Sequence, residues 1–509
     1  MNDSMQRKWG AILSYVSIFA NTLIQLLYTP FLTRMLGQSE YGLYSLVASI
    51  IGYLTVLDLG FENAIIIYTA KYRANGEFEK EQKMHGMFKI IFYILALLIA
   101  ILGIGLYFMA DNLFEKTMNY AEITKAKIMT IILTINLLIV FSFNIYSSII
   151  IAYEKFIFQK IVTILNTVIR PVLMIPLLFL GFKSITLCIV ITFSNILVVI
   201  LNYMYCKKKL HVNVKFQGFD KTLFKELFNY SFYIFLGSIV DKINWSTDQF
   251  ILGMVSGTIA VSIYSVASQL NQLFVNLSTA VVGVLLPKIT KMVAKNATKS
   301  ELTDEMIKVG RIQWYIIFLL ASGFVLVGKE FICFWVGQEY IESYYVAMLL
   351  IIPVCVPLIQ NIGIGIMQAM NKHKFRAIST LLMAVFNVII SYFFAQSYGA
   401  IGVALGTTIS LILCNGIIMN IYYYKGLKLE INRFWKNILH ISIPFAIPIA
   451  LILIFMQIIK LSGIVSVLIY SSLYSLMYFA VAYYLSMNKY EKDIVNSYLC
   501  RFHINVSKK

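Results

Sequence analysis

The chain has 509 residues, of which 60% are hydrophobic and only 13% are charged. That charged share is about half of the ~25% usual in soluble domains, which excludes a soluble globular protein. The net charge of +18 would suit a nucleic-acid partner, but most lysines and arginines lie in short segments between apolar runs. Membrane topology explains that placement, so we expect a polytopic membrane protein that binds no nucleic acid.

Apolar runs of about 20 residues recur from end to end, and an α-helix needs this length to cross a bilayer. Fourteen spans are predicted, near residues 10–34, 41–70, 88–110, 126–152, 160–181, 184–205, 228–255, 259–286, 310–336, 344–370, 376–396, 399–424, 437–459 and 464–486. A cytoplasmic N-terminus places most basic residues on the cytoplasmic side, as the positive-inside rule requires. Because the number of spans is even, the C-terminus is predicted to be cytoplasmic too.

The first two spans meet at a turn in which Gly37 and Gly42 permit a tight reversal. The second span then carries Asp58 and Glu62 one helical turn apart, and therefore on one face. Two roles are open for these carboxylates. They bind a coupling ion, H⁺ or Na⁺, or the Asp58-Leu-Gly60 segment serves packing and helix capping.

The fifth span places Arg170 near the middle of the membrane. A charged group at that depth costs about 2.5–3.5 kcal/mol on insertion scales and normally faces a bundle interior or a water-filled cavity. Two roles are again open. Arg170 anchors an anionic substrate in a cavity, or it neutralises Asp58 or Glu62 within the N-terminal helices.

The seventh span is the most polar of the predicted helices. Asp241, Asn244, Trp245 and Asp248 are spaced i, i+3, i+4 and i+7, so they share one face. We predict Asn244, Trp245 and Asp248 as substrate contacts in a cavity, and Asp241 as another candidate for the coupling ion. Lys242 is a candidate anchor, although it also suits snorkelling or a local pair with Asp241.

Three local patterns of the first half recur in the second half, which indicates an internal duplication. Tyr44–Ser49 is echoed by Tyr264–Ser268, Lys155-Phe156 by Lys374-Phe375, and Gly181 by Gly399. An even number of spans per repeat gives two halves of the same orientation. We therefore predict a six-helix lobe at 1–215, a second six-helix lobe at 216–428, and two added helices with a cytoplasmic tail at 429–509.

Several of these residues form the signature of a known family. The signature residues are Arg34, Gly37, Tyr41, Gly42 and Gly60, which lie in the segments RMLGQSEYGLY and LDLGF. With Asp248-Gln249 and the Tyr264–Ala267 segment, they resemble polysaccharide repeat-unit flippases of the multidrug/oligosaccharidyl-lipid/polysaccharide (MOP) exporter superfamily. The resemblance covers roughly residues 8–430. The sixth span departs from the family pattern at Ser184, where a glycine is expected.

The resemblance implies an all-α polytopic fold with two six-helix lobes in a MATE-like V, plus two C-terminal helices. It also implies a transporter, without enzymatic activity, resident cofactor or metal. Such a protein flips undecaprenyl-diphosphate-linked oligosaccharide from the cytoplasmic to the outer leaflet by alternating access, for O-antigen, capsule or exopolysaccharide synthesis.

We expect a monomer in the bacterial inner membrane, in contact with membrane lipids and with polysaccharide polymerase machinery as a further partner. Two alternatives stay open. One is an ion-coupled multidrug exporter of the same superfamily, and the other is a membrane-embedded polymerase or glycosyltransferase.

Overall fold

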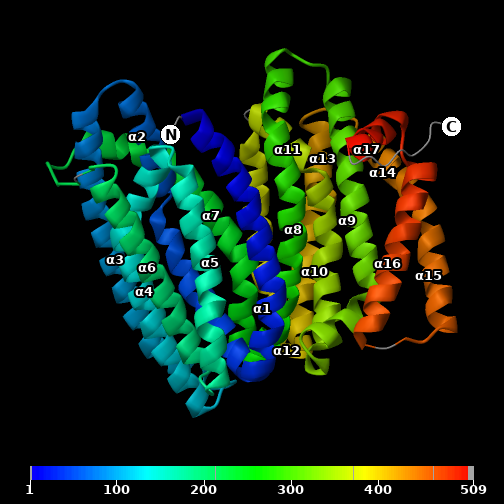
Figure 1. Cartoon of the computed structure of the whole chain (residues 1–509), viewed down its shortest axis with the longest axis horizontal. Helices are drawn as coiled ribbons and strands as arrows, with labels where there is room; N and C mark the ends of the chain where they lie inside the picture. The colour runs from blue at the N-terminus through cyan, green and yellow to red at the C-terminus, as the bar shows by residue number, and fades with distance from the viewer. Residues whose placement is uncertain (1–2, 213, 371, 462, 502–509) are drawn as a thin grey trace. The chain divides into compact units, whose positions relative to one another are not determined.

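The computed structural model describes the backbone of residues 3–212, 214–370, 372–461 and 463–501. The side chains of residues 3, 4, 7, 8, 11, 233, 234, 241, 244, 245, 277–287, 373 and 498–501 lie outside this description. All regular structure in the described part is helical (Figure 1), which confirms the predicted all-α fold.

Ten segments of the described chain are long and apolar enough to cross a membrane. Two of them, Ile12–Ala74 and Lys374–Lys425, contain a non-helical glycine, at Gly37 and Gly399. The helices α7 and α8 add 35 and 38 residues. These segments are consistent with the fourteen predicted spans.

The chain divides into two compact units, Met1–Ser265 with Ser391–Val403, and Val266–Ile390 with Ala404–Lys509. The helices of the first half are α1 (Asp3–Leu54), η1 (Thr55–Asp58), α2 (Phe61–Ala74), α3 (Phe78–Phe114), α4 (Tyr120–Ala152), α5 (Phe156–Phe179), α6 (Ser184–Lys208), α7 (Lys221–Val255) and α8 (Gly257–Ala294). Those of the second half are α9 (Lys299–Trp335), η2 (Gln338–Tyr340), α10 (Glu342–Ile359), α11 (Asn361–Ala369), α12 (His373–Leu411), η3 (Ile412–Ile418), α13 (Met419–Lys425), α14 (Ile431–Ser442), η4 (Ile443–Phe445), α15 (Ala446–Ile458), α16 (Gly463–Val481), η5 (Ala482–Ser486) and α17 (Lys489–Arg501). The domain boundaries predicted at residues 215 and 428 stay a prediction.

The predicted turn between the first two spans lies inside α1, which reverses at Gly37 (Figure 1). Gly37 has φ 77°, a left-handed conformation that residues with a Cβ rarely adopt, and nothing lies within 4 Å of where its Cβ would be. Gly42 has a different role from the one predicted. It is helical, and a Cβ there would lie 1.8 Å from the carbonyl oxygen of Thr258. Only a residue without a side chain allows the backbones of α1 and α8 to approach so closely.

The second span is not the continuous helix that was predicted for residues 41–70. α1 ends at Leu54, the short helix η1 follows, and α2 begins at Phe61. Leu59 and Gly60 between them both have positive φ, 55° and 73°. Two successive left-handed residues cannot continue a right-handed helix, which is why the span breaks there.

Three segments of the second half have local structure that the span predictions did not specify. The tenth span, predicted at 344–370, is interrupted at Gln360 between α10 and α11. The thirteenth, predicted at 437–459, matches the membrane-length segment Ile431–Ile458, within which η4 separates α14 from α15 and Pro444 lacks a backbone donor. The C-terminal segment predicted as a tail contains the helix α17.

Two local features recur along the chain at nearly constant offset. Gly37 and Gly257, 220 positions apart, both have positive φ next to a transmembrane helix, at 77° and 79°. Phe158 stacks on Tyr205 at a centroid distance of 3.8 Å, and Phe375 stacks on Tyr422 at 3.9 Å, with an offset of 217 in both rings. The structure therefore pairs Phe375 with Phe158, whereas the sequence echo paired it with the residue two positions earlier.

Candidate functional site

The break in the second span brings Asp58 and Glu62 into one cluster. The Asp58 carboxylate lies at the start of α2, where it interacts electrostatically with the backbone N–H groups of Gly60 and Glu62. Asn144 of α4 donates from Nδ2 to Asp58 Oδ1 at 3.4 Å, and the Asn144 side chain also hydrogen-bonds Glu62. Two half-buried acids therefore share one amide. The choice between ion binding and a packing or capping role for Asp58 stays open.

Arg170 lies in α5, where it reaches across to α6. Its Nε donates to Ser194 Oγ at 3.2 Å, and its Nη2 donates to Asn195 Oδ1 at 2.9 Å. Asn195 in turn donates from Nδ2 to Asn136 Oδ1 of α4 at 3.0 Å. All these partners are neutral. The alternative in which Arg170 neutralises Asp58 or Glu62 is wrong for this structure, because those two acids contact Asn144 instead.

The charge of Arg170 is thus not compensated by a carboxylate. Among the side chains that the structure describes, no ion pair includes Arg170. Its two hydrogen bonds use two of the five N–H donors of a guanidinium. Tyr28 and Tyr44 of α1 interact with it electrostatically, and the Tyr28 hydroxyl is buried without a hydrogen-bond partner in the described part of the chain. The arrangement leaves donors for an anion.

Two polar residues of α7, Lys242 and Asp248, have different surroundings. Lys242 is half-buried beside α1, with its Nζ 3.5 Å from where a Cβ of Gly52 would be, and it forms no ion pair in the described regions. Asp248 is buried, 1% exposed, and accepts a hydrogen bond from the Tyr264 hydroxyl of α8. Asp248 therefore joins α7 to α8 in this structure. The shared face of Asp241, Asn244, Trp245 and Asp248 stays a prediction.

Three predicted site residues, Asp241, Asn244 and Trp245, lie outside the described side chains. Their predicted roles stay predictions. The signature residue Arg34 is exposed, and Tyr41 is buried at 8% exposure.

A polar cluster that the sequence analysis did not single out joins the turn of α1 to α4, α6 and α8. Ser39 and Thr258 both donate to Glu122 Oε1, at 2.5 and 2.9 Å. The neighbouring Glu40 accepts hydrogen bonds from Lys125 and Ser184. Ser184 is the residue at which the sequence departs from the family pattern, and its hydroxyl donates the hydrogen bond to Glu40.

The amides Asn136, Asn144 and Asn195 were also missed. Each lies in an apolar span, at an intermediate or buried position, and each binds one of the charged residues discussed above or its partner. The sequence did contain a signal for these residues, because an amide side chain in a membrane helix needs a polar partner. A search for uncharged polar residues at mid-span would have found them.

Solved structures with the same fold define the class of protein. The chain superposes on the lipid II flippase MurJ in an inward closed conformation with a TM-score of 0.72, at 18% identity, covering 96% of this chain and 99% of that one. An inward-facing multidrug resistance transporter of the MATE family gives a TM-score of 0.65 at 15% identity, covering 80% and 96%. The fold is that of MOP-type membrane transporters.

Residues 8–293 match the family described as polysaccharide biosynthesis protein, so the chain belongs to that family. It is also 26% identical over 409 residues to a protein named putative O-antigen transporter from Shigella flexneri, covering 77% of this chain and 92% of that protein. The predicted family is confirmed. These relatives are named as transporters and flippases rather than enzymes, in agreement with the expected transport role.

Proposed function

We propose that this protein flips undecaprenyl-diphosphate-linked oligosaccharide repeat units across the bacterial inner membrane, from the cytoplasmic to the outer leaflet, by alternating access. The observation that carries the proposal is Arg170, an intramembrane cation whose hydrogen-bond partners among the described residues are all neutral. The Shigella flexneri protein, named as an O-antigen transporter, supports the substrate class.

The physical need for such a protein follows from the substrate. Each hydroxyl that enters hydrocarbon without a partner costs roughly 1–3 kcal/mol, and an oligosaccharide carries on the order of ten. An isolated ion costs tens of kcal/mol by idealised solvation arguments, so the diphosphate adds far more. A flippase therefore provides polar groups within the membrane, including a cation for the diphosphate.

Arg170 meets that need in this chain. Two unit charges 4 Å apart attract by about 4 kcal/mol at an effective dielectric constant of 20. That energy corresponds to roughly a thousandfold in affinity. In the proposal, Ser194 and Asn195 hold the guanidinium in place while its other N–H groups bind a diphosphate oxygen. Lys242, with Asn244, Trp245 and Asp248, is proposed to contact the same substrate.

The carboxylates Asp58 and Glu62 are proposed to bind the coupling H⁺ or Na⁺, because two acids share one amide donor there. Asp241 belongs to the same proposal. The protein is proposed to act as a monomer with both termini in the cytoplasm, alongside the polysaccharide polymerase machinery.

The test is complementation in cells that lack their own repeat-unit flippase. Surface polysaccharide and the internal pool of lipid-linked precursor are measured together. We expect Arg170→Gln to reduce surface polysaccharide at least tenfold and to let the precursor accumulate. The separate variant Arg170→Lys, which keeps the positive charge, should retain part of the activity. Lys116→Gln, which removes an exposed cation, serves as the matched control and keeps normal display.

Normal display with Arg170→Gln at normal protein level would show that Arg170 does not anchor the substrate. If the unmodified chain rescues no repeat-unit type but raises efflux of toxic cations, the multidrug-exporter alternative replaces the flippase.

A further inference from the structure

The first unit contains a groove that no step of the proposed transport uses. Its floor is α4, which packs against α3 on one side and α6 on the other. The segment after α6 closes one end. The groove has a volume of about 880 Å³. It is lined by Lys89 and Tyr93 of α3, Ile139, Phe143 and Tyr146 of α4, Ile196, Val199, Ile200, Tyr203 and Lys207 of α6, and His211, Val212 and Val214.

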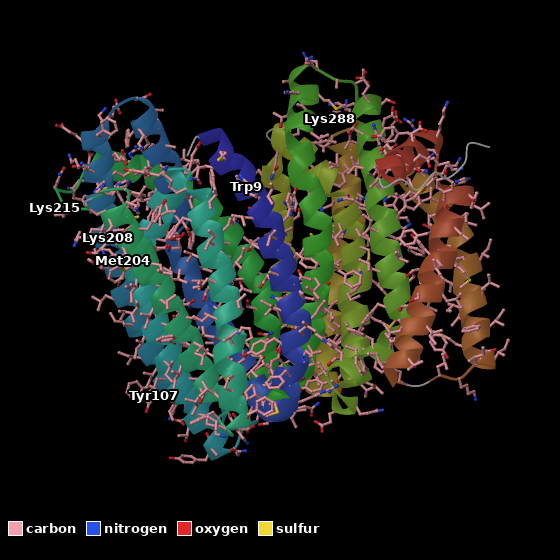
Figure 2. All side chains as sticks on the ribbon, viewed as in Figure 1. Trp9, Tyr107, Met204, Lys208, Lys215 and Lys288 are labelled. Carbon is pink, nitrogen blue, oxygen red and sulfur yellow. The ribbon has the colours of Figure 1, made fainter. Side chains whose placement is uncertain are left out.

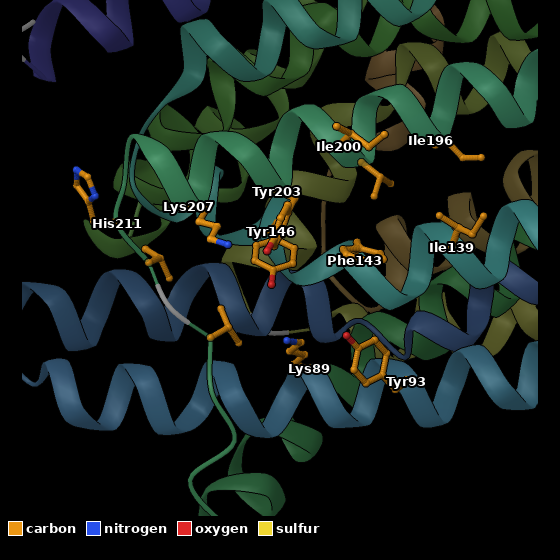
Figure 3. A pocket seen from close by; sticks show the side chains of 13 residues that line it. Lys89, Tyr93, Ile139, Phe143, Tyr146, Ile196, Ile200, Tyr203, Lys207 and His211 are labelled. Carbon is orange, nitrogen blue, oxygen red and sulfur yellow. The ribbon is translucent and has the colours of Figure 1, made fainter.

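The lining changes in character along the groove. Figure 3 shows Lys207 near the Tyr203 ring and Lys89 across the groove near Tyr146, with Ile139 and Ile196 toward the other end. Along α6 the lining is cationic at Lys207, then aromatic with a hydroxyl at Tyr203, then aliphatic at Ile200 and Ile196. A membrane phospholipid has the matching order of phosphate, glycerol ester region and acyl chain, and tyrosines are enriched at that intermediate depth.

The aromatic part of the groove is well packed. Tyr146 and Tyr203 meet edge to face with a centroid distance of 5.1 Å, and Phe143 lies 6.2 Å from the Tyr203 ring. Tyr146 is 5% exposed. Since these rings support one another across α4 and α6, the floor of the groove is a preformed surface.

The two lysines that line the groove have no acidic partner among the described side chains. Within the regions that the structure describes, neither Lys89 nor Lys207 forms an ion pair, whereas the nearby Lys83 pairs with Asp220 at 3.6 Å. Each amine instead lies over a ring, at 5.9 Å from the Tyr93 centroid for Lys89 and 5.7 Å from the Tyr203 centroid for Lys207. Two uncompensated cations on either side of a groove favour an anion between them.

The helices that form the groove also expose large apolar side chains. Ile94 and Leu97 of α3 and Ile200 of α6 are 61%, 62% and 49% exposed. Side chains of this kind on a membrane protein face lipid rather than water, so a ligand entering here comes from the bilayer. A free, water-soluble phosphate has no apolar part that could occupy the aliphatic end of the groove.

We propose that this groove binds one anionic phospholipid. Its phosphate lies between Lys89 and Lys207, the Tyr146 and Tyr203 rings line the ester region, and an acyl chain follows Ile139 and Ile196. Basic pockets between membrane helices are known to hold anionic headgroups. The lysines lie at the end of the helices where α6 finishes, the end predicted to be cytoplasmic. This site is separate from Arg170, so it does not depend on the proposed transport function.

The experiment uses the full-length protein in detergent and counts retained lipids by native mass spectrometry. Equal amounts of phosphatidylglycerol and phosphatidylcholine are offered. We expect one phosphatidylglycerol to be retained in preference to phosphatidylcholine. Each lysine near a charged headgroup changes affinity by about fivefold, so Lys89→Gln with Lys207→Gln should lose about 25-fold.

The matched control is Lys208→Gln with Lys215→Gln, which removes two exposed lysines outside the groove (Figure 2). It should keep the preference. Ile200→Trp, which fills the groove without changing charge, should reduce retention of both lipids.

Three results would overturn the proposal: equal retention of the two lipids by the unmodified protein, equal retention of phosphatidylglycerol by the groove and control variants, or no effect of Ile200→Trp. A fourth is displacement of phosphatidylglycerol by undecaprenyl diphosphate, with the same dependence on Lys89 and Lys207. That outcome would assign the groove to the transported lipid instead.

Discussion

The ion pair between Arg311 and Glu491 joins the C-terminal helix α17 to α9. Breaking it tests how much this buried contact contributes to the stability of the protein. Arg311 Nε lies 2.6 Å from Glu491 Oε1, and Arg311 Nη2 lies 2.8 Å from Glu491 Oε2. The same Oε2 accepts from the Tyr315 hydroxyl at 3.2 Å and from the Asn488 backbone N–H at 2.8 Å. The side chains of Arg311 and Glu491 are only 10% and 4% exposed.

The perturbation is Glu491→Gln, which keeps the shape of the side chain and removes its charge. The guanidinium then stays buried without a counter-charge. Removing one partner of a buried ion pair typically destabilises a protein by about 3–5 kcal/mol. Because the amide oxygen of the new side chain could still accept from Asn488 and Tyr315, we expect a loss near the lower end of that range. Replacing both partners, Arg311→Met with Glu491→Leu, leaves no unpaired charge and should recover most of that loss.

The assay is reversible unfolding of the purified protein in mixed micelles, followed by circular dichroism, together with protease cleavage after residue 486. The control is Glu430→Gln, since the Glu430–Arg433 pair is 46% and 47% exposed and should contribute within ~1 kcal/mol. Unchanged stability with Glu491→Gln would refute the reasoning. So would additivity in the double-mutant cycle of Arg311→Met and Glu491→Leu, with each substitution also measured alone, because a true pair must show coupling.

Two further predictions concern the first unit. Gly42→Ala should destabilise the protein by about 1–3 kcal/mol, as overpacking does, because its Cβ would lie 1.8 Å from a backbone oxygen. Gly105→Ala, with nothing within 4 Å, should instead leave unfolding midpoints unchanged or slightly raised, and equal midpoints for both variants would contradict the assigned close approach. Asp220 caps α7, and the N–H of Leu223 holds the pKa of its carboxyl below the usual value of 3.8. The stabilisation that ionised Asp220 gives is therefore fully present above the unfolded-state pKa and is lost as pH falls through the folded-state pKa. We expect the stabilities of the wild type and of Asp220→Asn, measured against pH, to converge at low pH. Parallel curves would count against this role.

Much of the fold was predictable because membrane spans depend on composition and length. The all-α class, the family and the reversal at Gly37 were visible in the sequence. The break at Leu59 and Gly60 was not, because a leucine gives no signal for a left-handed conformation. It is set by tertiary contacts, among them the hydrogen bond from Asn144 of α4 to Asp58.

The candidate site was predictable in its charged residues and not in their partners. Mid-membrane position identified Arg170, Asp58 and Glu62, but spacing along one helix cannot tell which neighbouring helix supplies the partner. Ser194, Asn195 and Asn144 come from α6 and α4, which only the packed structure brings alongside. Gly42 shows the same limit, since its function depends on the backbone of α8.

The two left-handed residues between η1 and α2 have a mechanical consequence. A continuous helix transmits torque, because its ladder of hydrogen bonds resists unwinding. At Leu59 and Gly60 that ladder is interrupted, because both residues have positive φ. Torque on the preceding helix is therefore transmitted to α2 less completely than it would be along one continuous helix.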